Sequence, residues 1–261
     1  DEVEVWNIAL TESEIQENMY NELTGYENGL VGYWNFNDGD GDVLTDLTPN
    51  GNNGAINGAT WSDDFPLPPH TGPEWYVSES GSDENNGSSE YPFATIQYAI
   101  NSANENDSIF VATGTYVENI NFNGKNIAVI GEDRENTIID GDGNGTVVTF
   151  ENGETSVSKL DGFTITNGAA VHSGGIWCKN TSSPTITNCN IVGNTASYDG
   201  GGINISDSSS PTIKYCLIDN NKSGGGGGIY FYGSGSPSIV NCTITRNVAN
   251  SQGGNAIFCA S

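Results

Sequence analysis

Basic residues are scarce in this chain of 261 residues, in which seven Lys and Arg stand against 33 Asp and Glu. The formal net charge of −26 repels nucleic acid and anionic membranes, so we expect neither as a partner. A polyanionic polysaccharide would need bridging cations to approach such a surface, and the charge suits a protein exported to a salty or calcium-containing medium. No hydrophobic run reaches the length of about 18 residues that a membrane-spanning helix needs, so we expect no membrane insertion.

Cysteine is also sparse, with five in the chain, and no pair has the spacing of a metal clip. Cys189, Cys216 and Cys242 recur at equivalent positions of the repeat described next. We interpret them as buried thiols that act as small hydrophobic groups. A disulfide between two neighbours in this row remains an alternative.

Gly, Asn, Ser and Thr are abundant instead, and from Ser173 onward one pattern occurs three times and begins a fourth time. The copies read SGGIWCKNTSSPTITNCNIVGN, GGGINISDSSSPTIKYCLIDNN and GGGIYFYGSGSPSIVNCTITRN, followed by GGNAIFCAS. Pro184, Pro211 and Pro237 recur after 27 and 26 residues. Short β-type runs at such a period, separated by Gly, Ser, Asn and Pro, indicate a solenoid of stacked coils. The sequence therefore predicts an all-β fold, a right-handed parallel β-helix.

Strand alternation predicts which side chains of each coil point inward. The inward set before each proline comprises Ile176, Cys178, Ile203, Ile205, Ile229, Phe231, Ile257 and Cys259. The inward set after it comprises Ile186, Cys189, Ile191, Ile213, Cys216, Ile218, Ile239, Cys242 and Ile244. The three-residue step from Ile to Cys predicts a bend between two short strands. Asn194, Asn221 and Asn247 are predicted to form a structural ladder at a turn rather than to bind a ligand.

The same alternation predicts an outward column on one face of the solenoid. It contains Trp177, Asn204, Tyr230 and Phe258, with Lys179, Ser206 and Tyr232 beside it. Large aromatic residues that point to solvent are not needed for folding. Trp177, Tyr230, Tyr232 and Phe258 are therefore the candidate glycan-binding residues. Two alternatives stay open: strands favour aromatic residues in any case, or another part of the parent protein covers this face.

The start of the β-helix carries a different signal. Ile96, Ala99, Ile100 and Ala103 have helical spacing, and a solenoid must close the open end of its core, so we expect an N-terminal capping helix. The stretches ATIQYAINSAN, DSIFVATGTYVENI, IAVIGE and TIIDG, with the later repeat GGGI…NCTITRN, resemble the pectin lyase-like superfamily and in particular its secreted parallel β-helix repeat proteins. The resemblance implies the fold and an extracellular location. It does not imply an activity, because a fold does not determine a function.

The N-terminal segment resembles a different family. DEVEVWNIALTESEI, GLVGYWNFNDGDGD and DLTPNGNNGAINGATW are similar to the C-terminal part of LamG-like, concanavalin A-type jelly-roll domains of secreted bacterial proteins. The resemblance implies a partial β-sandwich over residues 1–65, from a family in which some members bind glycans or mediate adhesion, often with Ca²⁺. Residues 66–74 are predicted to be a Pro-rich linker and residues 75–261 the β-helix. Both ends look cut, so we expect a fragment whose β-helix is truncated at its C-terminus.

Catalytic residues are not identifiable in the sequence. Pectate lyases, pectin esterases and polygalacturonases belong to the superfamily, but none of the two Arg and five Lys lies in a recognisable acid cluster, and VHSGG around His172 is not the GHG segment of polygalacturonases. Asp140, Asp142 and Asn144 supply oxygen donors of the kind that Ca²⁺ prefers, although a glycine-rich turn is the favoured interpretation of this segment. Ca²⁺ is the one cofactor that the sequence suggests.

The function predicted first is a secreted or cell-surface bacterial module, monomeric and non-catalytic, that contacts a polysaccharide or cell-surface glycan. A polysaccharide lyase or glycoside hydrolase whose site lies partly outside the sequence is the alternative. A rigid spacer in a large surface protein is the third hypothesis.

Overall fold

The structure is a computed structural model that describes residues 2–19, 21–61, 67–250 and 253–260. The chain divides into two compact units, Asp1–Leu67 and Pro68–Ser261. Within the described residues, neither helix is long and apolar enough to cross a bilayer.

The described residues of the first unit form one helix and four strands. The strands β1 (Val3–Trp6) and β2 (Leu30–Trp34) pair antiparallel, as do β3 (Val43–Leu44) and β4 (Gly54–Ala55). Helix α1 (Glu12–Asn18) begins with the capping box that the sequence predicts, in which Thr11 and Glu14 satisfy each other's backbone N–H groups. These elements form two small sheets, and the assignment of this unit to the jelly-roll family remains a prediction.

A buried carboxylate fastens the loop after β3 to strand β2. Asp46 accepts hydrogen bonds from the backbone N–H groups of Tyr33 (3.0 Å), Thr48 (2.9 Å) and Asn52 (2.7 Å), and from the Thr48 hydroxyl (3.0 Å). Burial alone would raise the pKa of Asp46, but these donors outweigh it and lower the pKa to about 2. The charged form of Asp46 therefore stabilises the fold of this unit.

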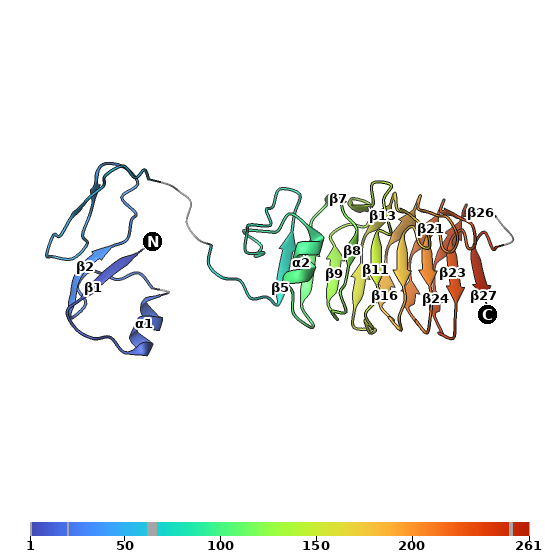
Figure 1. Cartoon of the computed structure of the whole chain (residues 1–261), viewed down its shortest axis with the longest axis horizontal. Coiled ribbons are helices and arrows are strands. Elements are labelled where there is room, and N and C mark those ends of the chain that lie inside the picture. Colours follow the sequence, from blue (N-terminus) through green and yellow to red (C-terminus); the bar gives the residue numbers. More distant parts are fainter. Residues whose placement is uncertain (1, 20, 62–66, 251–252, 261) are drawn as a thin grey trace. The chain divides into compact units, whose positions relative to one another are not determined.

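The second unit is a parallel β-helix with three long sheets and a short fourth one (Figure 1). Sheet 1 contains β5 (Glu74–Val77), β6 (Ser108–Val111), β9 (Ala128–Gly131), β12 (Lys159–Asp161), β16 (Thr185–Thr187), β20 (Thr212–Lys214) and β24 (Ser238–Val240). Sheet 2 contains β7 (Gly114–Val117), β10 (Thr137–Asp140), β13 (Thr164–Thr166), β17 (Asn190–Val192), β21 (Leu217–Asp219) and β25 (Thr243–Thr245). Sheet 3 contains β8 (Ile120–Asn121), β11 (Val148–Phe150), β15 (Ile176–Cys178), β19 (Ile203–Ile205), β23 (Ile229–Tyr232) and β27 (Ile257–Ala260). Sheet 4 contains β14 (Ala169–Ala170), β18 (Thr195–Ala196), β22 (Lys222–Ser223) and β26 (Val248–Ala249).

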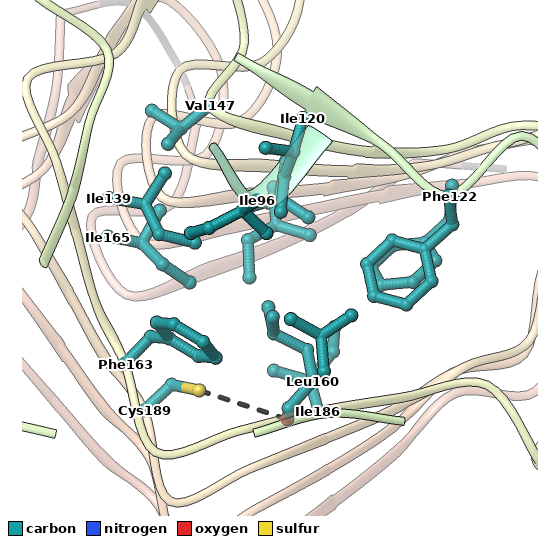
Figure 2. Packing of buried hydrophobic residues seen from close by; sticks show 14 of the residues in the cluster. Ile96, Ile120, Phe122, Ile139, Val147, Leu160, Phe163, Ile165, Ile186 and Cys189 are labelled. Carbon is teal, nitrogen blue, oxygen red and sulfur yellow. Dashed lines mark hydrogen bonds between the residues drawn. The ribbon is translucent and has the colours of Figure 1, made fainter. Parts of the chain in front are cut away.

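Each strand pairs with its equivalent one coil further on, so like residues stack on like. Ile176 lies beside Ile203, which lies beside Ile229, and all three are fully buried. Side chains from the different sheets fill a common interior, as Figure 2 shows for Phe122, Leu160 and other core residues. The predicted interior is confirmed for the coils up to β21.

The predicted bend between the two strands after each proline is also present. The residues at the bend, Asn188, Tyr215 and Asn241, have left-handed backbone angles, with φ of 52°, 58° and 52°. Each comes directly before one of the recurring cysteines Cys189, Cys216 and Cys242, whose side chains point inward. Cys189 and Cys216 are buried. The Cys189 thiol donates to the carbonyl of Thr187 at 3.1 Å, so its polar group is satisfied within its own coil.

Helix α2 (Ile96–Ser102) covers the N-terminal end of the β-helix, as predicted (Figure 1). Thr95 caps it, and Ile96, Ala99 and Ile100 are fully buried on the core. The other end differs from the sequence-based expectation, because Ile239 is 36% exposed, Ile257 is 40% exposed and Cys259 is exposed although all three were predicted to face inward. They lie on β24 and β27, the last strands of sheets 1 and 3, on which no further described strand packs.

Candidate functional site

The outer face of sheet 3 carries the candidate glycan-binding residues. Trp177, Asn204, Tyr230 and Phe258 lie side by side on β15, β19, β23 and β27, and we call these four residues the outer column. Tyr232 lies two positions beyond Tyr230 on the same strand and is 52% exposed. The structure thus brings together all four aromatic residues that the sequence singles out, although Trp177, Tyr230 and Phe258 are half-buried rather than fully exposed.

Ring contacts within the face leave only part of each aromatic surface open. Tyr230 and Phe258 stack on each other with ring centroids 5.5 Å apart and an interplanar angle of 18°. The ammonium group of Lys179 lies over the Trp177 ring, 4.0 Å from its centroid, and the Trp177 indole N–H donates to the Ser206 hydroxyl at 3.2 Å. A ligand would therefore stack on the remaining ring faces and edges.

Asn204 departs from the expectation that the whole outer column points to solvent. Its side chain is only 1% exposed, and its amide group donates to the backbone carbonyl of His172 at 3.1 Å. The side-chain oxygen of Asn204 is buried and has no hydrogen-bond donor within the described part of the chain. An unpaired buried acceptor of this kind costs about 1–3 kcal/mol.

A His–Asp pair borders the outer column, and the sequence analysis missed it. His172 Nδ1 lies 2.7 Å from a carboxylate oxygen of Asp199. The imidazole also contacts two aromatic rings, with centroid distances of 5.7 Å to Trp177 and 6.3 Å to Tyr198. The two partners are separated by one repeat of 27 residues, so they occupy equivalent positions in consecutive coils. That spacing is the signal that could have identified the pair.

The ammonium group of Lys179, beside the outer column, is already paired. Lys179 forms an ion pair with Glu151 at 2.7 Å, again between equivalent positions of neighbouring coils. The hydrogen bond from Lys179, together with one from Asn121, lowers the pKa of Glu151. Burial raises the pKa of Tyr230, and the negative charge of Asp199 raises it further. The face therefore combines aromatic rings with a local excess of carboxylates.

The residues proposed for Ca²⁺ lie elsewhere, at the end of β10 and in the turn after it. One carboxylate oxygen of Asp140 accepts from the backbone N–H of Asp142, and the other accepts from the Asn167 amide, both at 2.8 Å. Asn144 uses its backbone carbonyl to accept from the Asn119 amide at 2.8 Å. Asp142 and Asn167 also line a hollow of about 290 Å³. The Asp140 carboxylate thus serves the turn itself, and the Ca²⁺ assignment remains a prediction.

Comparison with known proteins defines the class of the chain. Residues 86–261 match the family described as "Right handed beta helix region", and because this is more than half of the chain, the protein belongs to that family. A search of curated proteins finds no match. Among solved structures, a pectin methylesterase from carrot is similar, with 18% sequence identity and a TM-score of 0.35. The match covers 68% of this chain and 66% of the carrot chain.

Proposed function

We propose that the protein is an extracellular, non-catalytic module that contacts carbohydrate through the outer face of sheet 3. The observation that carries the proposal is the in-register row of aromatic side chains on β15, β23 and β27. Sugar rings have apolar faces that pack against aromatic rings, and exposed aromatic groups on a flat rigid sheet are a common form of contact surface. The resemblance of the β-helix to secreted repeat proteins supports the extracellular location.

A polysaccharide lyase or hydrolase is the second candidate, and the His172–Asp199 pair is the observation that favours it. A carboxylate that holds a histidine ring in place is a common arrangement for a general base. A nucleophile or second acid is also needed, and no hydrogen bond in the described structure joins His172 to a Ser, Thr or Cys side chain. The geometry therefore supports binding better than catalysis.

The first unit fits the same proposal through its resemblance to LamG-like domains, some of which bind glycans. We propose that it is part of such a jelly-roll domain and that the chain acts as a monomer. In the spacer hypothesis, by contrast, the aromatic face is covered by another part of the parent protein and has no ligand of its own.

A glycan array and a polysaccharide-degradation assay on the 261-residue chain test the proposal. Trp177→Ala and Tyr230→Ala are the test variants, and Tyr215→Asn is the control, because Tyr215 is an exposed aromatic residue at a bend outside sheet 3. We expect glycan binding that falls at least tenfold in the test variants and not in the control, with no release of sugar. Release of reducing or unsaturated sugar ends would replace this proposal by the enzyme, and absence of binding would leave the spacer.

A further inference from the structure

We propose that the aromatic face of sheet 3 selects uncharged glycans and rejects polyuronates and sulfated glycans. The inference rests on the proposed function, because it names the class of carbohydrate that the same site takes. Charge pairing and unused hydrogen-bonding groups around the outer column carry it.

The first step is that no positive charge on this face is free. Lys179 is the only Lys or Arg beside the outer column among the described residues, and its ammonium group is committed to Glu151 at 2.7 Å and to the ring of Trp177. A ligand carboxylate or sulfate is bound by Lys and Arg groups or by several convergent N–H donors. To use Lys179, an anionic sugar would have to displace Glu151 and leave that carboxylate unpaired.

The second step is that negative charges surround the site. Glu151 lies beside Lys179, Asp199 holds His172, and Asp207 accepts from the backbone N–H of Asn180 at 3.0 Å. The charge of Asp199 already disfavours a negative charge on Tyr230, whose pKa is raised chiefly by burial and further by this neighbour. The same field acts on an anionic ligand at this position and weakens its binding. The net charge of −26 extends the repulsion over the whole molecule.

The third step is that the open hydrogen-bonding groups are neutral. The hydroxyl groups of Tyr230 and Tyr232 make no hydrogen bond in the structure as described. A sugar hydroxyl both donates and accepts, so it can pair with each of these groups. These neutral groups offer an anionic ligand no positive charge to pair with.

Affinity electrophoresis of the 261-residue protein in gels that contain matched polysaccharides tests the inference. The pairs are hydroxyethyl cellulose and carboxymethyl cellulose, dextran and dextran sulfate, and methyl-esterified and de-esterified polygalacturonate, each run with EDTA and with Ca²⁺. Within at least one pair, we expect the uncharged member to bind at least tenfold more tightly than the charged member in EDTA, and Trp177→Ala to abolish this binding. The double variant Asp199→Asn, Asp207→Asn is expected to narrow the difference between the two members.

Each other outcome is decisive. Equal or tighter binding of the charged members, lost in Trp177→Ala, would overturn the inference and leave the proposed function standing. Binding of charged members through Ca²⁺ with no binding of the uncharged ones would overturn it in the same way. If no member of any pair binds, the inference fails, and if none of the glycans on the array binds either, the proposed function fails with it.

Discussion

The backbone N–H of Asn194 donates a hydrogen bond of 2.9 Å to the side-chain oxygen of Asn221, its equivalent one coil further on. Asn221 repeats the same bond to Asn247 at 2.9 Å, and each side-chain amide also donates to a backbone carbonyl of the preceding coil. The ladder therefore joins successive coils through groups that are buried from water.

Replacing Asn221 by Ala should destabilise the β-helix strongly. The substitution removes the acceptor of the Asn194 N–H, which is left buried without a partner, and it removes the side-chain bond to the Ile191 carbonyl. At about 1–3 kcal/mol for the unsatisfied group and about 1 kcal/mol for the lost hydrogen bond, we expect a loss of about 2–4 kcal/mol in the free energy of unfolding, measured by urea denaturation. Asn190→Ala is the control, because the half-buried Asn190 amide makes one long bond of 3.4 Å. Similar losses in the two variants would contradict a structural role for the ladder.

Tyr215→Asn should stabilise the protein. Tyr215 has a φ of 58° at a bend where the neighbouring coils have Asn188 and Asn241, with the same backbone angles. A left-handed conformation costs an ordinary L-residue roughly 1–2 kcal/mol, and Asn tolerates it better. Because Tyr215 is 55% exposed, little burial is lost, and we expect a gain of about 0.5–1 kcal/mol in thermal or urea unfolding. Tyr215→Ala is the comparison, since Ala has no such preference. A gain of the same size in Tyr215→Ala would show that loss of the aromatic ring, not the backbone angle, is responsible.

The sequence predicts the β-helix well because its repeat determines both the strand pairing and the inward positions. Strand alternation within one coil predicts that Ile203 and Cys216 point inward, and turn chemistry predicts the Asn221 ladder. The structure has both features. The capping helix follows from helical spacing at Ile96 and Ala99. At the last coil, Ile257 is exposed because burial depends on a neighbouring coil as well as on the direction of the side chain.

The chemistry of the outer face could be predicted only in part. Strand alternation places Trp177 and Tyr230 in one row, but it does not reveal that Lys179 lies over the Trp177 ring or that Asn204 is buried. Those contacts depend on side-chain rotamers and on the turns that flank the sheet. The His172–Asp199 pair lies in such turns, where alternation gives no direction, and only its one-repeat spacing could have revealed it.

Glu154→Gln should destabilise the coil that follows β11. Glu154 is fully buried, and its carboxylate accepts from the N–H groups of Gly124 (2.8 Å) and Asn152 (3.1 Å) and from the Ser182 hydroxyl (2.6 Å). An amide would turn an NH₂ group toward at least one of these donors, so we expect a loss of about 2–3 kcal/mol. Thermal unfolding followed by circular dichroism measures the loss. Glu84→Gln, at an exposed position, is the control, and equal melting temperatures for the two variants would contradict the predicted role of the carboxylate.

Acid should loosen the first unit through Asp46. Its pKa is lowered from 3.8 to about 2 in the folded chain, so the folded state binds fewer protons than the unfolded state between these pH values. The stabilisation is therefore complete above about pH 4 and is lost as the pH falls toward 2. In Asp46→Asn this pH dependence should disappear, and an NH₂ group would face the N–H of Asn52 or of Tyr33, which costs about 2 kcal/mol at neutral pH.

Hydrogen exchange at neutral pH should show faster exchange in residues 30–52 of Asp46→Asn with unchanged rates in residues 203–245. Asp40→Asn, in an exposed turn, is the control for thermal unfolding of the first unit between pH 5 and 2. If the difference between wild type and Asp46→Asn stayed constant across that range, the lowered pKa of Asp46 would not contribute to the stability of this unit.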